Sequence, residues 1–208
     1  MPNPNFLPSQ MTRGYRNTSP FLPLWRWSAK TSRIVNWGVT IASVFLCLLA
    51  LPVRLPGMEL LGIGPNWLLI WVVAWSVKRS PLQGAIAGLV LGLLQDGMSS
   101  PHPTHALGLI VVGVLTALLQ KQRYIQEDFI SVALIVFGMT AIAETVMALQ
   151  FSLASLRGAG DGTFPSLSYI WTYHQRITLA SALLSSLWAP VLYFPLERWW
   201  ETLRSMEE

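Results

Sequence analysis

The strongest constraint on this chain is a series of long apolar segments that contain almost no charge. Only 12% of the 208 residues are charged and 52% are hydrophobic, whereas a soluble domain has about 25% charged residues. The apolar segments lie at residues 34–53, 65–77, 82–96, 105–120, 129–151 and 177–196. Because a helix needs about 20 apolar residues to cross a bilayer, the pattern predicts an all-α fold, a polytopic membrane helical bundle with six transmembrane helices.

Polar segments divide the chain into three parts. Residues 1–32 form a cationic, proline-containing tail that we expect to lie disordered or at the membrane interface, residues 33–197 form the membrane domain, and residues 198–208 form a short charged tail. With six spans, eleven of the fourteen lysines and arginines lie on one side of the membrane, and Arg54, Arg157 and Arg176 lie on the other. The positive-inside rule then places both termini in the cytoplasm.

The cations also indicate what the chain contacts. They flank apolar spans, so the basic balance indicates binding to the headgroups of membrane lipid rather than to nucleic acid. The tripeptide Trp25-Arg26-Trp27 in the first tail is typical of an interfacial anchor. The alternative is that this tripeptide docks on a cytoplasmic protein.

The longest expected connection joins the last two helices and covers residues 152–176. Three glycines in its first half favour mobility, and Tyr169, Trp171 and Tyr173 favour a second half that rests at the membrane interface. We also expect Pro190 and Pro195 to bend the end of the last helix, because proline lacks the N–H that a helix interior needs.

Gly84, Gly88, Gly92 and Asp96 recur every fourth residue and therefore lie along one slowly turning helix face. Small residues on one face let another helix approach closely in lipid. Asp96, at the end of this face, has two interpretations. It caps the end of a packing surface, or it anchors a partner or ligand at the membrane surface. His105, which begins the next helix, lies in the same region.

Glu144 is the one acidic residue well inside a predicted span. An isolated carboxylate in hydrocarbon costs several kcal/mol, so this side chain should be paired, hydrated or protonated. The candidate partners at the same depth are Arg176 and Arg54. Glu144 either fixes the packing of its helix or belongs to a ligand or proton site.

The last predicted helix has a stripe of small and hydroxylated residues that suits helix packing. We expect the third, fifth and sixth helices to meet through this stripe and the glycine face. The stripe contains Thr178, Ala182 and Ser185.

Enzyme chemistry has no support in the sequence. There is no phosphate-binding loop, no nucleophile elbow and no HExxH pair, and the single cysteine, Cys47, lies in an apolar segment. His102 and His105 lie in one turn, but two histidines without a third at a fixed spacing do not indicate a metal site. We expect no catalytic residue, no metal and no cofactor.

Three short motifs carry a family resemblance. They are Pro65-Asn66-Trp67-Leu68-Leu69, the glycine face that ends in Gly92-Leu93-Leu94-Gln95-Asp96, and His105-Ala106-Leu107. Their order and spacing resemble the rod shape-determining protein MreD family over roughly residues 34–200.

The resemblance implies a non-enzymatic scaffold in the bacterial inner (plasma) membrane. Such proteins act in cell elongation with an MreC-like protein, and with MreB, RodA and a transpeptidase during peptidoglycan synthesis. Their fold is thought to be similar to the substrate-binding subunits of energy-coupling-factor vitamin transporters. The alternative function is therefore a small-molecule-binding transport subunit, with a ligand pocket formed by Asp96, His105, Glu144 and Arg176. A third possibility is a scaffold with no pocket.

Overall fold

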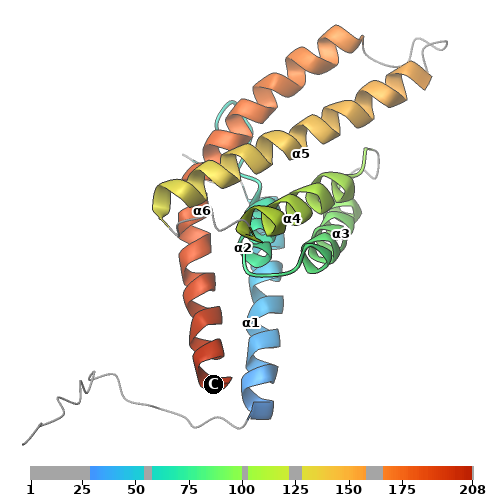
Figure 1. The fold of residues 1–208 in the computed structure, drawn as a ribbon. Helices are drawn as coiled ribbons and strands as arrows, with labels where there is room; N and C mark the ends of the chain where they lie inside the picture. The colour runs from blue at the N-terminus through green and yellow to red at the C-terminus, as the bar shows by residue number, and fades with distance from the viewer. Residues whose placement is uncertain (1–28, 54–57, 100–102, 122–127, 158–165, 208) are drawn as a thin grey trace, which may run out of the picture.

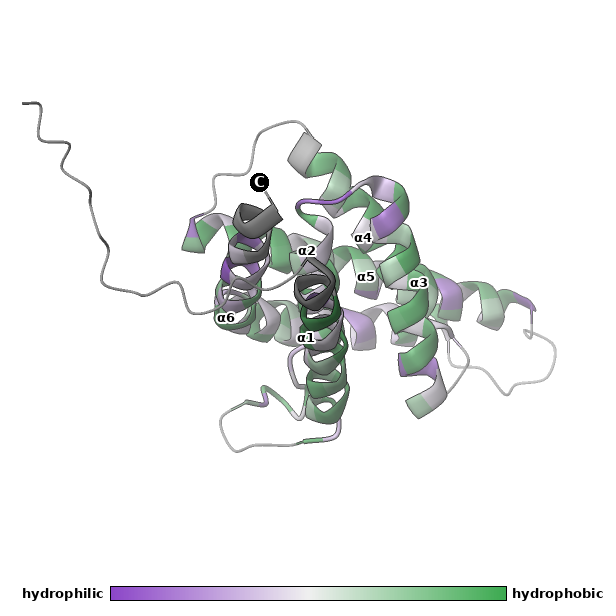
Figure 2. Cartoon of the chain, turned by 90° about the horizontal axis from the view of Figure 1, so that it is seen from below, coloured by the Kyte–Doolittle hydropathy of each residue, from purple (hydrophilic) through white to green (hydrophobic). Residues whose placement is uncertain are grey.

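The computed structural model describes residues 29–53, 58–99, 103–121, 128–157 and 166–207. Within these ranges the chain forms six helices and no strand (Figure 1). The helices are α1 (Ala29–Ala50), α2 (Trp67–Ser76), α3 (Pro81–Met98), α4 (His105–Lys121), α5 (Phe129–Arg157) and α6 (Leu167–Glu207). The start of α1 and the end of α6 lie at the same end of the molecule in both views (Figures 1 and 2). The first tail, with its Trp-Arg-Trp tripeptide, lies outside the described residues.

Local hydrogen bonds set the starts of the short helices. Ser80 and Gln83 form a capping box at the start of α3, in which each side chain accepts a hydrogen bond from the backbone N–H of the other residue. Pro81 takes the first helical position, where its missing N–H costs no helical hydrogen bond. At α2 the cap is Asn66, whose side chain accepts from the backbone N–H of Leu69 at 3.1 Å.

The core of the molecule is built around α2. This helix contacts all five other helices, and its residues 68–74 are all buried. A helix of ten residues is only about 15 Å long, which is half of the ~30 Å hydrocarbon core. Among the described residues, α5 and the stretch Leu167–Thr202 of α6 are long and apolar enough to cross a membrane. The six-span topology therefore stays a prediction.

The expected long connection between the last two helices is wrong. Helix α5 continues to Arg157 and α6 already begins at Leu167, so most of residues 152–176 is helical. The two helices pack against each other along this stretch: His174 is buried, and its ring lies 5.3 Å from the ring of Phe151. Packing between the two helices stabilises their extension into the expected connection. The three glycines at 158–162 lie outside the described residues.

The expected end of the last helix near residue 196 is also wrong. Helix α6 runs for 41 residues to Glu207 and includes both Pro190 and Pro195. It changes direction along its length (Figure 1). Tyr193, Leu196 and Trp200 lie on one face and are buried. Their burial against the bundle stabilises the helix beyond the prolines.

Candidate functional site

The glycine face of α3 packs against α4. A Cβ atom added at Gly84 would overlap the carbonyl of Gly113, one at Gly88 would overlap the carbonyl of Leu109, and one at Gly92 would overlap the backbone of Ala106. The two helices are therefore as close as their backbones allow, and only glycine fits at these three positions of α3.

This pairing corrects one expectation. Helices α5 and α6 do pack together, but α3 packs against α4 and α2 rather than against α5 and α6. On α6, Ala182 and Ser185 are fully buried, and the hydroxyl of Ser185 accepts a hydrogen bond from the backbone N–H of Asn66 at 2.9 Å. Thr178 is partly buried and donates to the carbonyl of His174 within α6. The stripe on α6 thus faces the start of α2 and α5.

Asp96 lies at the end of the glycine face and binds the start of α4. One carboxylate oxygen accepts from the backbone N–H of His105 at 2.8 Å and lies 2.7 Å from Nδ1 of the same residue. The other oxygen accepts from the hydroxyl of Thr104. An anion at a helix N-terminus is favoured by the helix dipole and by the free backbone N–H groups. The geometry favours the capping interpretation of Asp96.

Gln150 of α5 joins this arrangement. Its side-chain oxygen accepts from the backbone N–H of Thr104 at 3.1 Å, and its side-chain nitrogen donates to the carbonyl of Thr104 at 3.0 Å. We call Asp96, Thr104, His105 and Gln150 the Asp96 cluster. The cluster ties α5 to the turn between α3 and α4. Sequence reasoning missed Gln150, although an uncharged amide within a long apolar helix was a usable indication.

Glu144 lies near the Asp96 cluster but apart from Arg176. It lines a cavity of about 20 Å³ together with His105, Gln150 and other residues of α3, α4 and α5, and this volume accommodates about one water molecule. Arg176 is exposed, and no ion pair joins it to Glu144, both of which are described residues. The other expected partner, Arg54, lies outside the described residues. The four predicted site residues therefore do not converge on one ligand pocket.

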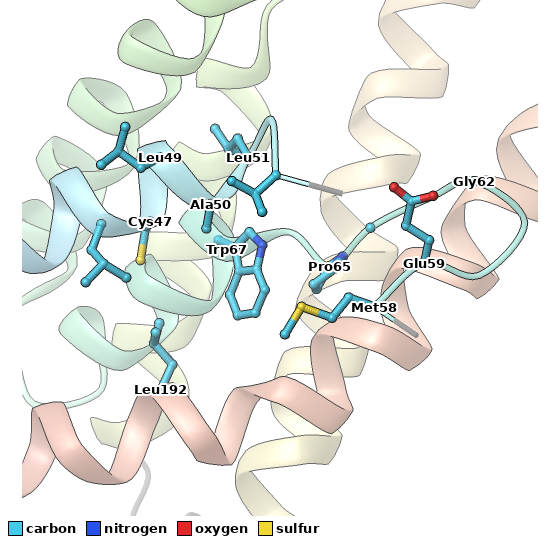
Figure 3. Close-up of a pocket in the computed structure, with 13 residues that line it drawn as sticks. Cys47, Leu49, Ala50, Leu51, Met58, Glu59, Gly62, Pro65, Trp67 and Leu192 are labelled. Carbon is cyan, nitrogen blue, oxygen red and sulfur yellow. The ribbon is translucent and has the colours of Figure 1, made fainter. Parts of the chain in front are cut away.

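A larger pocket of about 440 Å³ lies elsewhere, between the end of α1, the segment before α2, and α6. Figure 3 shows Cys47, Met58, Trp67 and Leu192 around it. Its volume is within the range of small-molecule sites, but among the described residues that line it, Glu59 is the one with a charge. None of the predicted ligand residues lines it, so the pocket does not support the transport-subunit alternative.

A second polar and aromatic group lies at the opposite end of the bundle from the Asp96 cluster. The Lys78 ammonium lies 2.5 Å from Glu197 and 2.9 Å from Glu201 of α6. Next to this ion pair, the ring of Trp200 makes edge contacts with the rings of Trp71 and Trp75, with centroids 6.5 and 5.3 Å apart. Sequence reasoning missed this contact because the two segments lie more than 120 residues apart.

The Asp96 cluster contains one residue from each of two family motifs, Asp96 and His105, and Asn66 of the third motif joins α2 to α6. A model of the rod shape-determining protein MreD family matches residues 31–202, from the first turn of α1 to the C-terminal part of α6. A search of curated proteins finds no match. Because the family match covers all six helices, the chain belongs to the rod shape-determining protein MreD family.

Proposed function

We propose that this chain is a non-enzymatic scaffold of the bacterial cell-elongation complex that binds an MreC-like protein and, through it, the wall-synthesis machinery. The family match over residues 31–202 carries the proposal. MreD proteins are bacterial membrane proteins of the rod-shape complex, which also contains MreC, and they form a shape-determining rather than an enzyme family. MreB, RodA and a transpeptidase are the further partners of this proposal.

The proposed topology is multi-pass in the inner membrane, with both termini in the cytoplasm. Two observations support a shared side for the termini and the α2–α3 turn. The start of α1 and the end of α6 lie at one end of the molecule (Figure 1). In addition, Lys78 of the α2–α3 turn pairs with Glu197 and Glu201 near the end of α6.

The proposed partner surface lies at the other end of α5 and α6. The end of α5 and the start of α6 project away from the other four helices (Figure 1). We call this part, residues 151–157 and 167–176, the α5–α6 arm. Leu153, Leu156, Tyr169 and Tyr173 are each more than half exposed on the arm. Exposed tyrosines are enriched both at protein interfaces and at the membrane surface. Gln150, at the base of the arm, connects it to the Asp96 cluster.

The decisive experiment is purification of the tagged full-length protein from native membranes in mild detergent, with mass spectrometry of the proteins that accompany it. We expect an MreC-like protein and wall synthases. The double variant Tyr169→Ala, Tyr173→Ala should lower recovery of the MreC-like protein about fivefold or more, because buried aromatic side chains contribute much of the binding free energy of an interface. Leu134→Ala, at an exposed site on α5 outside the arm, is the matched control.

Two outcomes would contradict the proposal. Recovery of an ATPase pair with its coupling subunit, in place of MreC, would identify a transporter component. Unchanged recovery of the MreC-like protein with the double variant would reject the α5–α6 arm as the partner surface.

A further inference from the structure

A large groove lies between α1 and α3, separate from the Asp96 cluster and the α5–α6 arm. Its volume is about 690 Å³. The two helices each pack against α2, and Figure 2 shows them as separate, mainly apolar helices. The α1 wall contains Trp37, Ile41 and Val44, and the α3 wall contains Ile86, Val90 and Leu94.

The floor of the groove is aromatic. Trp71 and Trp75 of α2 line it, and their rings are stacked with centroids 5.2 Å apart. The indole N–H of Trp71 donates to the hydroxyl of Ser43 at 2.9 Å. That polar hydrogen is already bonded within the protein. Trp71 is only 3% exposed and supports the floor from below, whereas Trp75 is partly exposed and presents its ring to the groove.

Polarity changes along the groove. Its polar lining residues, apart from Thr40, gather at the end where α1 begins and the α2–α3 turn lies: they are Asn36, Arg79 and Gln83. The guanidinium of Arg79 lies 4.1 Å from the ring centroid of Trp75. The side-chain oxygen of Asn36 is buried and has no hydrogen-bond partner among the described residues. A cation and two amide side chains thus lie at one end of the groove, and of the described lining residues beyond them only Thr40 is polar.

The length of the groove indicates what it accommodates. From Gln83 to Leu94 the α3 wall rises about 16 Å, at ~1.5 Å per residue. This is about half of the ~30 Å hydrocarbon core, which is the depth of one leaflet. A transmembrane helix of a partner would need a groove about twice as long. An acyl chain below a charged headgroup matches both the length and the polarity.

We propose that the groove binds one anionic phospholipid from the leaflet at the end of the bundle where α1 begins. The lipid phosphate pairs with Arg79, and the Gln83 side chain donates to the headgroup. The Asn36 oxygen accepts from a headgroup hydroxyl. One acyl chain lies between α1 and α3, above the stacked pair of Trp71 and Trp75 and in contact with the exposed part of Trp75. Anionic lipid is concentrated in the leaflet where cationic turns gather.

The test is native mass spectrometry of the full-length protein in mild detergent, titrated with phosphatidylglycerol and with phosphatidylcholine of the same acyl chains. We expect one phosphatidylglycerol to bind in preference to phosphatidylcholine. Arg79→Gln should weaken phosphatidylglycerol binding about tenfold or more, as for loss of a charge-assisted hydrogen bond, and should remove the preference. Val90→Trp should weaken binding of both lipids by filling the groove.

Matched controls are Arg198→Gln, an exposed arginine on α6 outside the α5–α6 arm, and Leu134→Trp, an exposed apolar site on α5. Both should bind lipid as the unmodified protein does. If Val90→Trp does not elute as a single folded species, Ile41→Trp fills the groove from the α1 wall. Equal affinity for the two lipids, or equal loss in the controls, would overturn the proposal. It would also be overturned if Val90→Trp and Ile41→Trp both folded and left lipid binding unchanged.

Discussion

At the scale of single residues, backbone contact between α3 and α4 leaves no room for a side chain. Gly88 faces the carbonyl of Leu109, whereas Gly97, near the end of the same helix, has open space where a Cβ would lie. The same substitution should therefore have opposite consequences at these two positions of one helix.

Gly88→Ala should lower the free energy of unfolding by about 1–3 kcal/mol, because overlap with backbone forces the helices apart. Gly97→Ala is the matched control and should leave stability unchanged or raise it by up to about 1 kcal/mol, since alanine favours a helix over glycine. The measurement is the midpoint of thermal unfolding in detergent, followed by size-exclusion chromatography of heated samples. Equal midpoints for the two variants would contradict the close contact at Gly88.

Asp96→Ala should destabilise the protein by about 1–3 kcal/mol, because it removes a helix cap and leaves the Thr104 hydroxyl and the His105 N–H without their acceptor. Asp96→Asn should cost less, since its carbonyl oxygen still accepts one of these hydrogen bonds. The same unfolding assay, together with recovery of the MreC-like protein, separates the two interpretations of Asp96. Normal stability with lost recovery would make Asp96 a partner-binding residue; lower stability with normal recovery and normal cell shape would make it a packing residue.

At the scale of whole helices, length is set by different forces in different places. Helix α3 begins where a capping box supplies local hydrogen bonds. Helix α6 continues past Pro190 and Pro195 because Leu196 and Trp200 are buried and Glu197 pairs with Lys78. Its C-terminal part is therefore held by tertiary contacts rather than by local preference.

Trp200→Ala should cost about 3–5 kcal/mol, the usual cost of emptying a buried tryptophan site, because Trp200 is 8% exposed and packs on Trp71 and Trp75. Phe194→Ala, on the same helix but 38% exposed, should cost much less. The readouts are the unfolding midpoint and protease cleavage of the C-terminal turns. Equal loss in both variants would show that the aromatic contact with α2 does not hold the end of α6.

At the scale of the whole molecule, α2 is the element that all other helices contact. The start of α1 and the end of α6 lie at the same end of the molecule, and the α5–α6 arm projects away from the other four helices (Figure 1). This arrangement separates the end that contains the α2–α3 turn from the end that contains the proposed partner surface.

Single cysteines at Ser100 and Gln122, each in a Cys47→Ala background, should differ in access to a membrane-impermeant thiol reagent added outside the cell. The proposed topology places residue 100 outside and residue 122 in the cytoplasm, since the positive-inside rule assigns cationic turns to the cytoplasm. The measurement is labelling of intact cells compared with lysed cells. Labelling at position 122 but not at position 100 in intact cells would show that the chain has the opposite orientation in the membrane.

Local patterns were enough to predict much of this protein. The apolar segments predicted the helices and the three motifs predicted the family, because each signal lies within a short stretch of sequence. The face of α4 that contacts α3 could also have been predicted from local sequence. Ala106 and Gly113 are small residues seven positions apart on one face of α4, and they contact Gly92 and Gly84.

The sequence by itself determined that the chain forms apolar helices, because segment length, charge depletion and capping act over short distances. Only the tertiary structure decided which faces meet: α3 on α4, Gln150 at the Asp96 cluster, and Trp200 on α2. The physical reason is that apolar residues surround most of each helix in a membrane bundle, so hydrophobicity does not distinguish one neighbour from another. Shape and a few long-range hydrogen bonds choose the neighbours, and they appear only when the whole chain is packed.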